Sequence, residues 1–192
     1  MPRKHAKRIN PRRVPIAKSA IDKDAILAEA MKDDMYHAWL LVVYAIIELE
    51  AIEIKDIPLL ADKVNRYVSK ASFHGKSKDT EMSRAERLMG IRNPYENLNP
   101  DVIKSKIELD KFKSKVIKVA THTALCVICL GLEASGTFDT DDLRRLFFNV
   151  DLTLAEIDSG RNSYGAIEEI LTAKTVQLEV YDDEYSTVNI TI

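Results

Sequence analysis

The sequence predicts a mainly α-helical bundle followed by a small β-hairpin. Apolar residues recur at helical spacing through most of the stretch between residues 20 and 171, and turn residues punctuate it. From residue 176 onward, apolar residues alternate with polar ones instead. With 192 residues, 46% of them hydrophobic, the chain can bury one ordinary core or two small ones. We expect a basic arm over residues 1–18, a helical domain over 19–174 and the hairpin over 175–192.

The first two helices are predicted from their starts. Ser19 followed three residues later by Asp22 is typical of a capping box, and apolar residues then keep helical spacing to residue 47. A helix is therefore expected over about residues 20–50. Asp56 is expected to cap a second helix, which tolerates Pro58 in its first turn.

The middle of the chain holds the longest helix. Residues 72–99 are irregular apart from a short helix expected after Ser83. Asn99-Pro100-Asp101 then supplies an N-cap, a proline at the first helical position and an acid in the first turn. The helix that follows should run to about Leu132 and be central to the core, because its second half is apolar nearly all round.

Two shorter helices and the hairpin complete the chain. Gly136 should end the long helix, and Asp139 or Thr140 should cap a helix that runs to about residue 157. A short helix is expected around residues 166–171. The alternation over 176–192 predicts two strands, which should pack on the helices or pair with another chain, because a lone hairpin is marginal in water.

An internal repeat is a further hypothesis. Residues 36–70 and 121–157 share an apolar helix ending in glutamate, a short turn, an acidic cap and a second apolar helix. Each copy would form an α-hairpin, and the two could bury their apolar faces against each other about a pseudo-twofold axis. The simpler alternative is that any two amphipathic helix pairs share this pattern.

The charge is strongly asymmetric although the total is near neutral. Residues 1–18 hold seven basic residues and no acidic ones, whereas residues 131–192 hold 4 basic and 13 acidic residues, a net charge of −9. The N-terminal segment has three prolines and almost no large apolar residue, so we expect a mobile cationic arm. It could bind an external polyanion, or dock on the acidic end of its own or a neighbouring chain.

Nucleic-acid binding is the first functional hypothesis. The arm would contact the nucleic acid together with lysines at helical spacing on the long helix, and with Lys76, Lys78, Arg84 and Arg87 as further cations. No base-reading motif or stacking aromatic accompanies the charge, and the simpler alternative is a solvated tail and helix face. The predicted contact residues are Arg3, Lys4, Lys7, Arg8, Arg12, Arg13, Lys104, Lys111, Lys115 and Lys118.

The second hypothesis is a protein-binding inhibitor or adaptor that acts on a host or phage protein. It would use the acidic C-terminal third, including Asp182, Asp183 and Glu184, to dock a basic surface. Under either hypothesis a homo-oligomer is plausible, with the hairpin edge or the basic arm bridging the chains.

No catalytic constellation is found, so we expect a protein without enzymatic activity, cofactor or metal. Cys126 and Cys129 have redox or half-zinc-site spacing, but they lie in a uniformly apolar run without a second cysteine pair, which favours core residues. Asp158–Glu169 lacks an oxygen ligand at the third position of a calcium loop. The uncharged apolar runs are shorter than the ~20 residues that span a bilayer, and the N-terminus does not have the composition of a secretion signal. We expect a cytoplasmic location and no membrane partner.

The N-terminal third resembles a known group of proteins. Lys7–Pro15 reads KRINPRRVP, Ala38-Trp39 starts an apolar helix, and a second helix ends in Val64-Asn65. These residues resemble small uncharacterised proteins encoded by phages and prophages of Firmicutes, over about residues 4–68. The resemblance implies a short helical protein with a basic start in the cytoplasm of a host cell, and it supplies no catalytic residues. The long basic middle, the duplicated half and the hairpin depart from that pattern.

Overall fold

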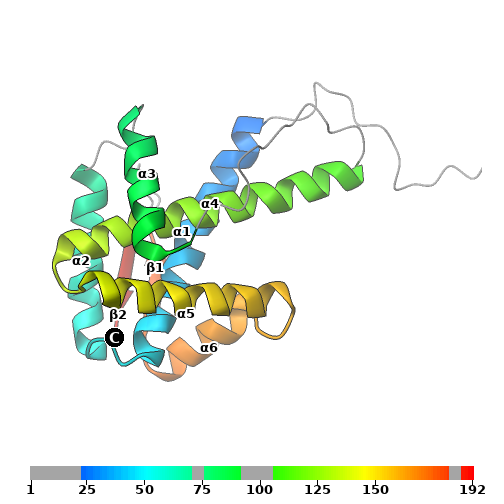
Figure 1. The fold of residues 1–192 in the computed structure, drawn as a ribbon. Coiled ribbons are helices and arrows are strands. Elements are labelled where there is room, and N and C mark those ends of the chain that lie inside the picture. Colours follow the sequence, from blue (N-terminus) through cyan, green and yellow to red (C-terminus); the bar gives the residue numbers. More distant parts are fainter. Residues whose placement is uncertain (1–22, 71–75, 92–105, 182–186) are drawn as a thin grey trace, which may run out of the picture.

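The computed structural model describes residues 23–70, 76–91, 106–181 and 187–192 (Figure 1). In these ranges the chain forms a bundle of six α-helices and a two-stranded antiparallel hairpin, which confirms the predicted fold class. The elements are α1 (Lys23–Glu48), the 3-10 turn η3 (Ile54–Asp56), α2 (Ile57–Lys70), α3 (Lys76–Met89), α4 (Lys106–Ser135), α5 (Thr140–Asp158), α6 (Tyr164–Ala173), β1 (Gln177–Val180) and β2 (Val188–Thr191).

Most helix ends match the sequence signals. The Asp139 carboxylate accepts hydrogen bonds from the backbone N–H groups of Asp141 and Asp142, both at 2.9 Å, and so caps α5. Gly136 adopts a left-handed conformation at φ 66° and ends the α4 region, as expected of a glycine at this position. Ser163 caps α6 by accepting a hydrogen bond from the backbone of Ala166 at 3.2 Å.

Four predicted helix starts differ from the structure or fall outside the described residues. Asp56 ends the 3-10 turn that leads directly into α2, rather than standing as an extended capping residue. α3 begins at Lys76, well before the short helix expected after Ser83. The predicted caps at Ser19 and at residues 99–101 lie outside the described residues.

The core is built on α1 and α4, which pack against each other most extensively. The second half of each helix is buried nearly all round, including Trp39, Leu41 and Val42 on α1 and Ile128 and Leu130 on α4. A helix that is apolar on every side is stable only in the interior, so these two halves occupy the centre of the bundle.

The shorter helices cover this centre reciprocally. α2 follows α1 in the chain but packs more extensively on α4. α5 follows α4 but packs more extensively on α1. The predicted repeat of residues 36–70 and 121–157 stays a prediction. The packing shows that the second helix of each stretch lies mainly against the long helix of the other.

The hairpin closes one side of the bundle. β1 and β2 are antiparallel, with Leu178 opposite Ile190 and Val180 opposite Val188. Val188 and Ile190 are buried, and β2 packs on α2 while β1 packs on α1. The Asn65 amide on α2 donates a hydrogen bond to the Val188 carbonyl at 2.7 Å and accepts one from the Val188 N–H at 3.4 Å. This side chain takes the place that a third strand would occupy at the outer edge of β2.

One described segment, Lys111–Ser135 in α4, is long and apolar enough to cross a membrane by length and composition alone. Within the bundle, 72% of its most apolar window is buried, as in the core helix of a soluble domain. The burial explains the apolar composition of α4 without a lipid environment.

Candidate nucleic-acid interface and the adjoining cleft

The first half of α4 carries the predicted lysine face and extends away from the rest of the bundle (Figure 1). Lys111 and Lys115 lie four residues apart, so they share a helical face, and both are exposed. Neither forms an ion pair with another described residue. Lys104 and the six predicted arm residues, from Arg3 to Arg13, lie outside the described residues.

Lys118 continues this face but is already engaged. Its ammonium lies 2.6 Å from a carboxylate oxygen of Asp158, at the end of α5. Both side chains are partly exposed, and exposed ion pairs contribute little to stability, so a phosphate could replace the carboxylate as the partner of Lys118. The strongest described part of the predicted interface is therefore Lys111 and Lys115.

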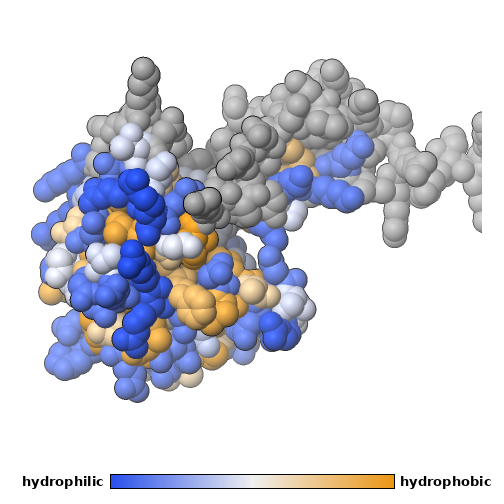
Figure 2. Space-filling view, in the orientation of Figure 1, coloured by the Kyte–Doolittle hydropathy of each residue, from blue (hydrophilic) through white to orange (hydrophobic). Residues whose placement is uncertain are grey.

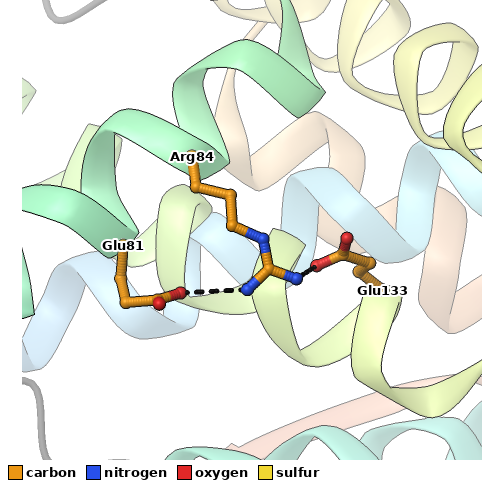
Figure 3. A network of polar contacts seen from close by, with 3 residues as sticks. All are labelled: Glu81, Arg84 and Glu133. Atoms are coloured by element: carbon orange, nitrogen blue, oxygen red, sulfur yellow. Dashed lines mark hydrogen bonds and ion pairs between the residues drawn. The ribbon is translucent and has the colours of Figure 1, made fainter.

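Arg84, considered as a further phosphate contact, has a structural role instead (Figure 3). Its guanidinium bonds to the Glu133 carboxylate on α4 and, at 3.2 Å, to Glu81 on its own helix. The hydrogen bond with Glu133 raises the pKa of Arg84 above its ordinary value. With two carboxylates on one guanidinium, Arg84 links α3 to α4 and adds no uncompensated charge to a phosphate-binding surface.

The two cysteines lie in the core. Both are fully buried, and burial raises the pKa of each thiol, that of Cys129 to about 12. The sulfur of Cys126 lies 3.6 Å from Nε2 of His122, but a thiol with a raised pKa is a poor nucleophile and a poor metal ligand. Within the described ranges, no group of three or more histidine, cysteine or acidic side chains could hold a metal ion.

A cleft of about 610 Å³ adjoins the lysine face, between α4 and the second half of α5. Met89 and Ile91 bound it at the end of α3, and Tyr164 bounds it at the start of α6. Its other lining residues are Lys113, Ser114, Ile117, Lys118, Thr121, His122, Leu125, Asp151, Leu154, Ala155, Ile157 and Asp158. Sequence reasoning did not predict this cleft, because its walls form only where α3, α4, α5 and α6 pack together, and no local pattern specifies that packing.

Paired polar groups lie at the base of the cleft. Thr121 donates a hydrogen bond to the buried Asp34 carboxylate at 2.8 Å. Nε2 of His122 lies 3.0 Å from a carboxylate oxygen of Glu86. These pairs tie α4 to α1 and α3. The contacts give Oδ1 of Asp34 and the buried ring of His122 a hydrogen-bond partner.

Tyr164 forms the far wall of the cleft and stacks on His37, with ring centroids 4.1 Å apart. Burial, and secondarily the charges of Asp34 and Asp158, raise the pKa of Tyr164 to about 12. Its phenol is therefore neutral at physiological pH and is not poised to act as a base.

The outer face of α5 beside this cleft exposes large apolar side chains among charged ones, and Figure 2 shows hydrophobic residues gathered on this side of the molecule. Phe148 is 63% exposed and Leu152 is 50% exposed, while Ile117 from α4 is 49% exposed. Sequence reasoning missed this face. The sequence feature that could have indicated this face is the pair Phe147–Phe148. Adjacent residues lie about 100° apart on a helix, so two neighbouring phenylalanines cannot both face the same core.

Comparison of the chain with protein-family models, with curated proteins and with solved structures gives no match.

Proposed function

We propose that this chain is a non-enzymatic phage or prophage accessory protein that binds nucleic acid through its basic arm and the basic face of α4. The observation that carries the proposal is the pair Lys111 and Lys115, exposed on one face of a helix half that extends from the bundle. The seven basic residues of positions 1–18 supply a second cationic segment of the same chain. The resemblance of residues 4–68 to phage and prophage proteins supports the biological setting, the cytoplasm of a host cell.

The physical basis is counterion release. Each lysine or arginine that neutralises a phosphate frees a condensed counterion, and this contribution to affinity does not depend on base sequence. Lys111 and Lys115 form no ion pair with the described carboxylates, so they lose no such partner on binding. We therefore expect binding that follows the phosphate backbone and discriminates weakly between sequences.

Fluorescence anisotropy with mixed-sequence duplex DNA and with RNA, at salt concentrations between ~50 and ~200 mM, tests this proposal. Replacing Lys111 and Lys115 by glutamine should reduce the slope of log Kd against log salt on duplex DNA by about 2, since each phosphate contact contributes about 0.9. Deleting residues 1–18 should reduce it further.

The matched control replaces Lys63 and Lys174 by glutamine. Both are exposed, they lie on other elements, and their replacement changes the net charge of the protein by the same amount. The control should keep the wild-type slope. Absent or salt-insensitive binding, or an equal loss in the control, would contradict the proposal.

The second candidate function is a protein-binding inhibitor or adaptor acting on a host or phage protein through the acidic C-terminal third. Glu169 on α6 and Glu179 on β1 are exposed and support it, whereas residues 182–184 lie outside the described residues. A partner recovered by affinity capture should be lost when Glu169 and Glu179 are both replaced by glutamine. Capture of nucleic acid alone would contradict this candidate.

A further inference from the structure

The exposed apolar face of α5 has a specific charge pattern. Phe148 lies at its centre, Arg144 and Arg145 lie toward the helix N-terminus, and Asp151 lies toward the C-terminus. All four side chains are exposed. At about 100° per residue, Arg144 and Asp151 fall on the same side of Phe148, one turn before it and one turn after it. The face therefore carries Arg144 one turn before Phe148 and Asp151 one turn after it, and Arg144 also contacts Asp141 nearer the start of the helix.

This charge pattern is complementary to itself after a 180° rotation about an axis perpendicular to α5. We propose that the outer face of α5 is the interface of a symmetric homodimer in which the α5 helices of two copies pack antiparallel. With the two-fold axis near Phe148, Arg144 of each copy faces Asp151 of the other, and this contact occurs twice. A parallel pair would instead place like charges opposite each other.

The surface beside Phe148 has room for the partner. A hollow of about 380 Å³ lies between this face and the end of α3, bounded by Met89, Gly90, Ile91, Arg144, Arg145, Phe148 and Asp151. An antiparallel partner with its axis near Phe148 places its own Phe148 at this hollow, where the rings of the two copies and the Met89 side chain can pack together. By the same rotation, Leu152, one turn along the helix, lies opposite Arg145 of the other copy and can pack on its aliphatic stem.

The charged residues of this face can exchange partners at little cost. The described contact of Arg144 is a 3.4 Å interaction with the Asp141 carboxylate, longer than an ordinary charged hydrogen bond. A second copy of the chain is the occupant that this surface fits best, because a two-fold axis near Phe148 brings Arg144 of each copy to Asp151 of the other.

The oligomeric state in the absence of nucleic acid tests the proposal, so its failure is separable from that of nucleic-acid binding. Light scattering after size exclusion, over a wide concentration range, should give twice the 21.7 kDa mass of one chain. Phe148→Asp should weaken dimerisation at least ~30-fold, the loss typical of an interface hot spot. The matched control is Leu59→Asp on α2, where the leucine is 58% exposed, and it should leave the mass unchanged. Circular dichroism verifies that both variants are folded.

Charge reversal tests the antiparallel geometry. Arg144→Asp alone and Asp151→Arg alone each place like charges opposite each other twice, so each variant should be largely monomeric. A mixture of the two variants should form a heterodimer, and the double variant R144D/D151R should recover the homodimer.

Three results would overturn the proposal. They are a wild-type chain that stays monomeric, a dimer that Phe148→Asp leaves intact, and charge-reversed variants that do not recover association when mixed.

Discussion

Gly131 lies where α4 crosses α2, and it permits the close approach of these two helices. A Cβ atom added at this position would lie 2.6 Å from Cγ1 of Val64, 3.2 Å from its Cβ and 3.3 Å from its Cα. Favourable contacts between carbon atoms occur at about 3.5–4.0 Å. Val64 is fully buried and β-branched, so it cannot rotate away. Gly131→Ala should therefore push the helices apart.

Two opposing contributions set the magnitude of this effect. Overpacking a well-packed core costs about 1–3 kcal/mol. Replacing a glycine inside a helix by alanine recovers about 1 kcal/mol of backbone free energy. The net expectation is a loss of about 0–2 kcal/mol in the free energy of unfolding, which lowers the melting temperature of a chain of this size by up to ~8 °C.

Urea unfolding followed by far-ultraviolet circular dichroism measures this loss, and the chain offers two controls. Gly165 in α6 has nothing within 4 Å of its added Cβ, so Gly165→Ala should stabilise the protein by up to ~1 kcal/mol. Val64→Ala removes the clashing methyl group, so the double variant with Gly131→Ala should show a favourable coupling of about 1–2 kcal/mol. If Gly131→Ala were as stabilising as Gly165→Ala, the steric argument would be wrong.

Two further predictions concern buried titratable groups. Burial raises the pKa of Tyr36 and of Tyr164 to about 12 from an ordinary 10, so their neutral forms favour the folded state. The contribution of these tyrosines to the free energy of unfolding should be fully present below pH 10 and should be lost between pH 10 and 12. Urea unfolding midpoints measured between pH 9 and 12 check this prediction, and they should fall less in Tyr36→Phe and Tyr164→Phe than in the wild type. Midpoints that do not change with pH would contradict it. Cys126 and Cys129 should resist a thiol-specific reagent at mildly alkaline pH in the native protein and react fully in concentrated guanidinium chloride. Rapid labelling of the native protein would show that these thiols are accessible.

Local signals predicted the helices, whereas packing between distant segments could not be predicted. Asp139 and Gly136 mark their helix ends because a cap depends on a few neighbouring residues. α3 was expected to be short because residues 76–81 are polar and give no helical period. Nothing local indicates that α2 lies mainly on α4 and α5 mainly on α1, since that choice depends on shape complementarity across the whole bundle.

The same limit applies to the candidate interface. Helical spacing correctly placed Lys111, Lys115 and Lys118 on the helix, and the first two are exposed. The engagement of Lys118 by Asp158 depends on where the end of α5 lies, which no local pattern specifies. The adjacent phenylalanines of α5 indicated a second apolar face, but only the packed bundle shows that Phe148 is left outside it.

The reciprocal packing of α2 on α4 and of α5 on α1 has a consequence for synthesis of the chain. The apolar half of α1 ends near residue 47, and its main partner, α4, is complete only at residue 135. At translation rates of ~5–20 residues per second, this interval is on the order of 4–18 s. Throughout that time a helix that is apolar on every side has no partner, and it is exposed to chaperones and to other nascent chains. Neither half of the protein should therefore be soluble when expressed alone, and a ribosome that stalls before α4 is complete would release a chain prone to aggregation.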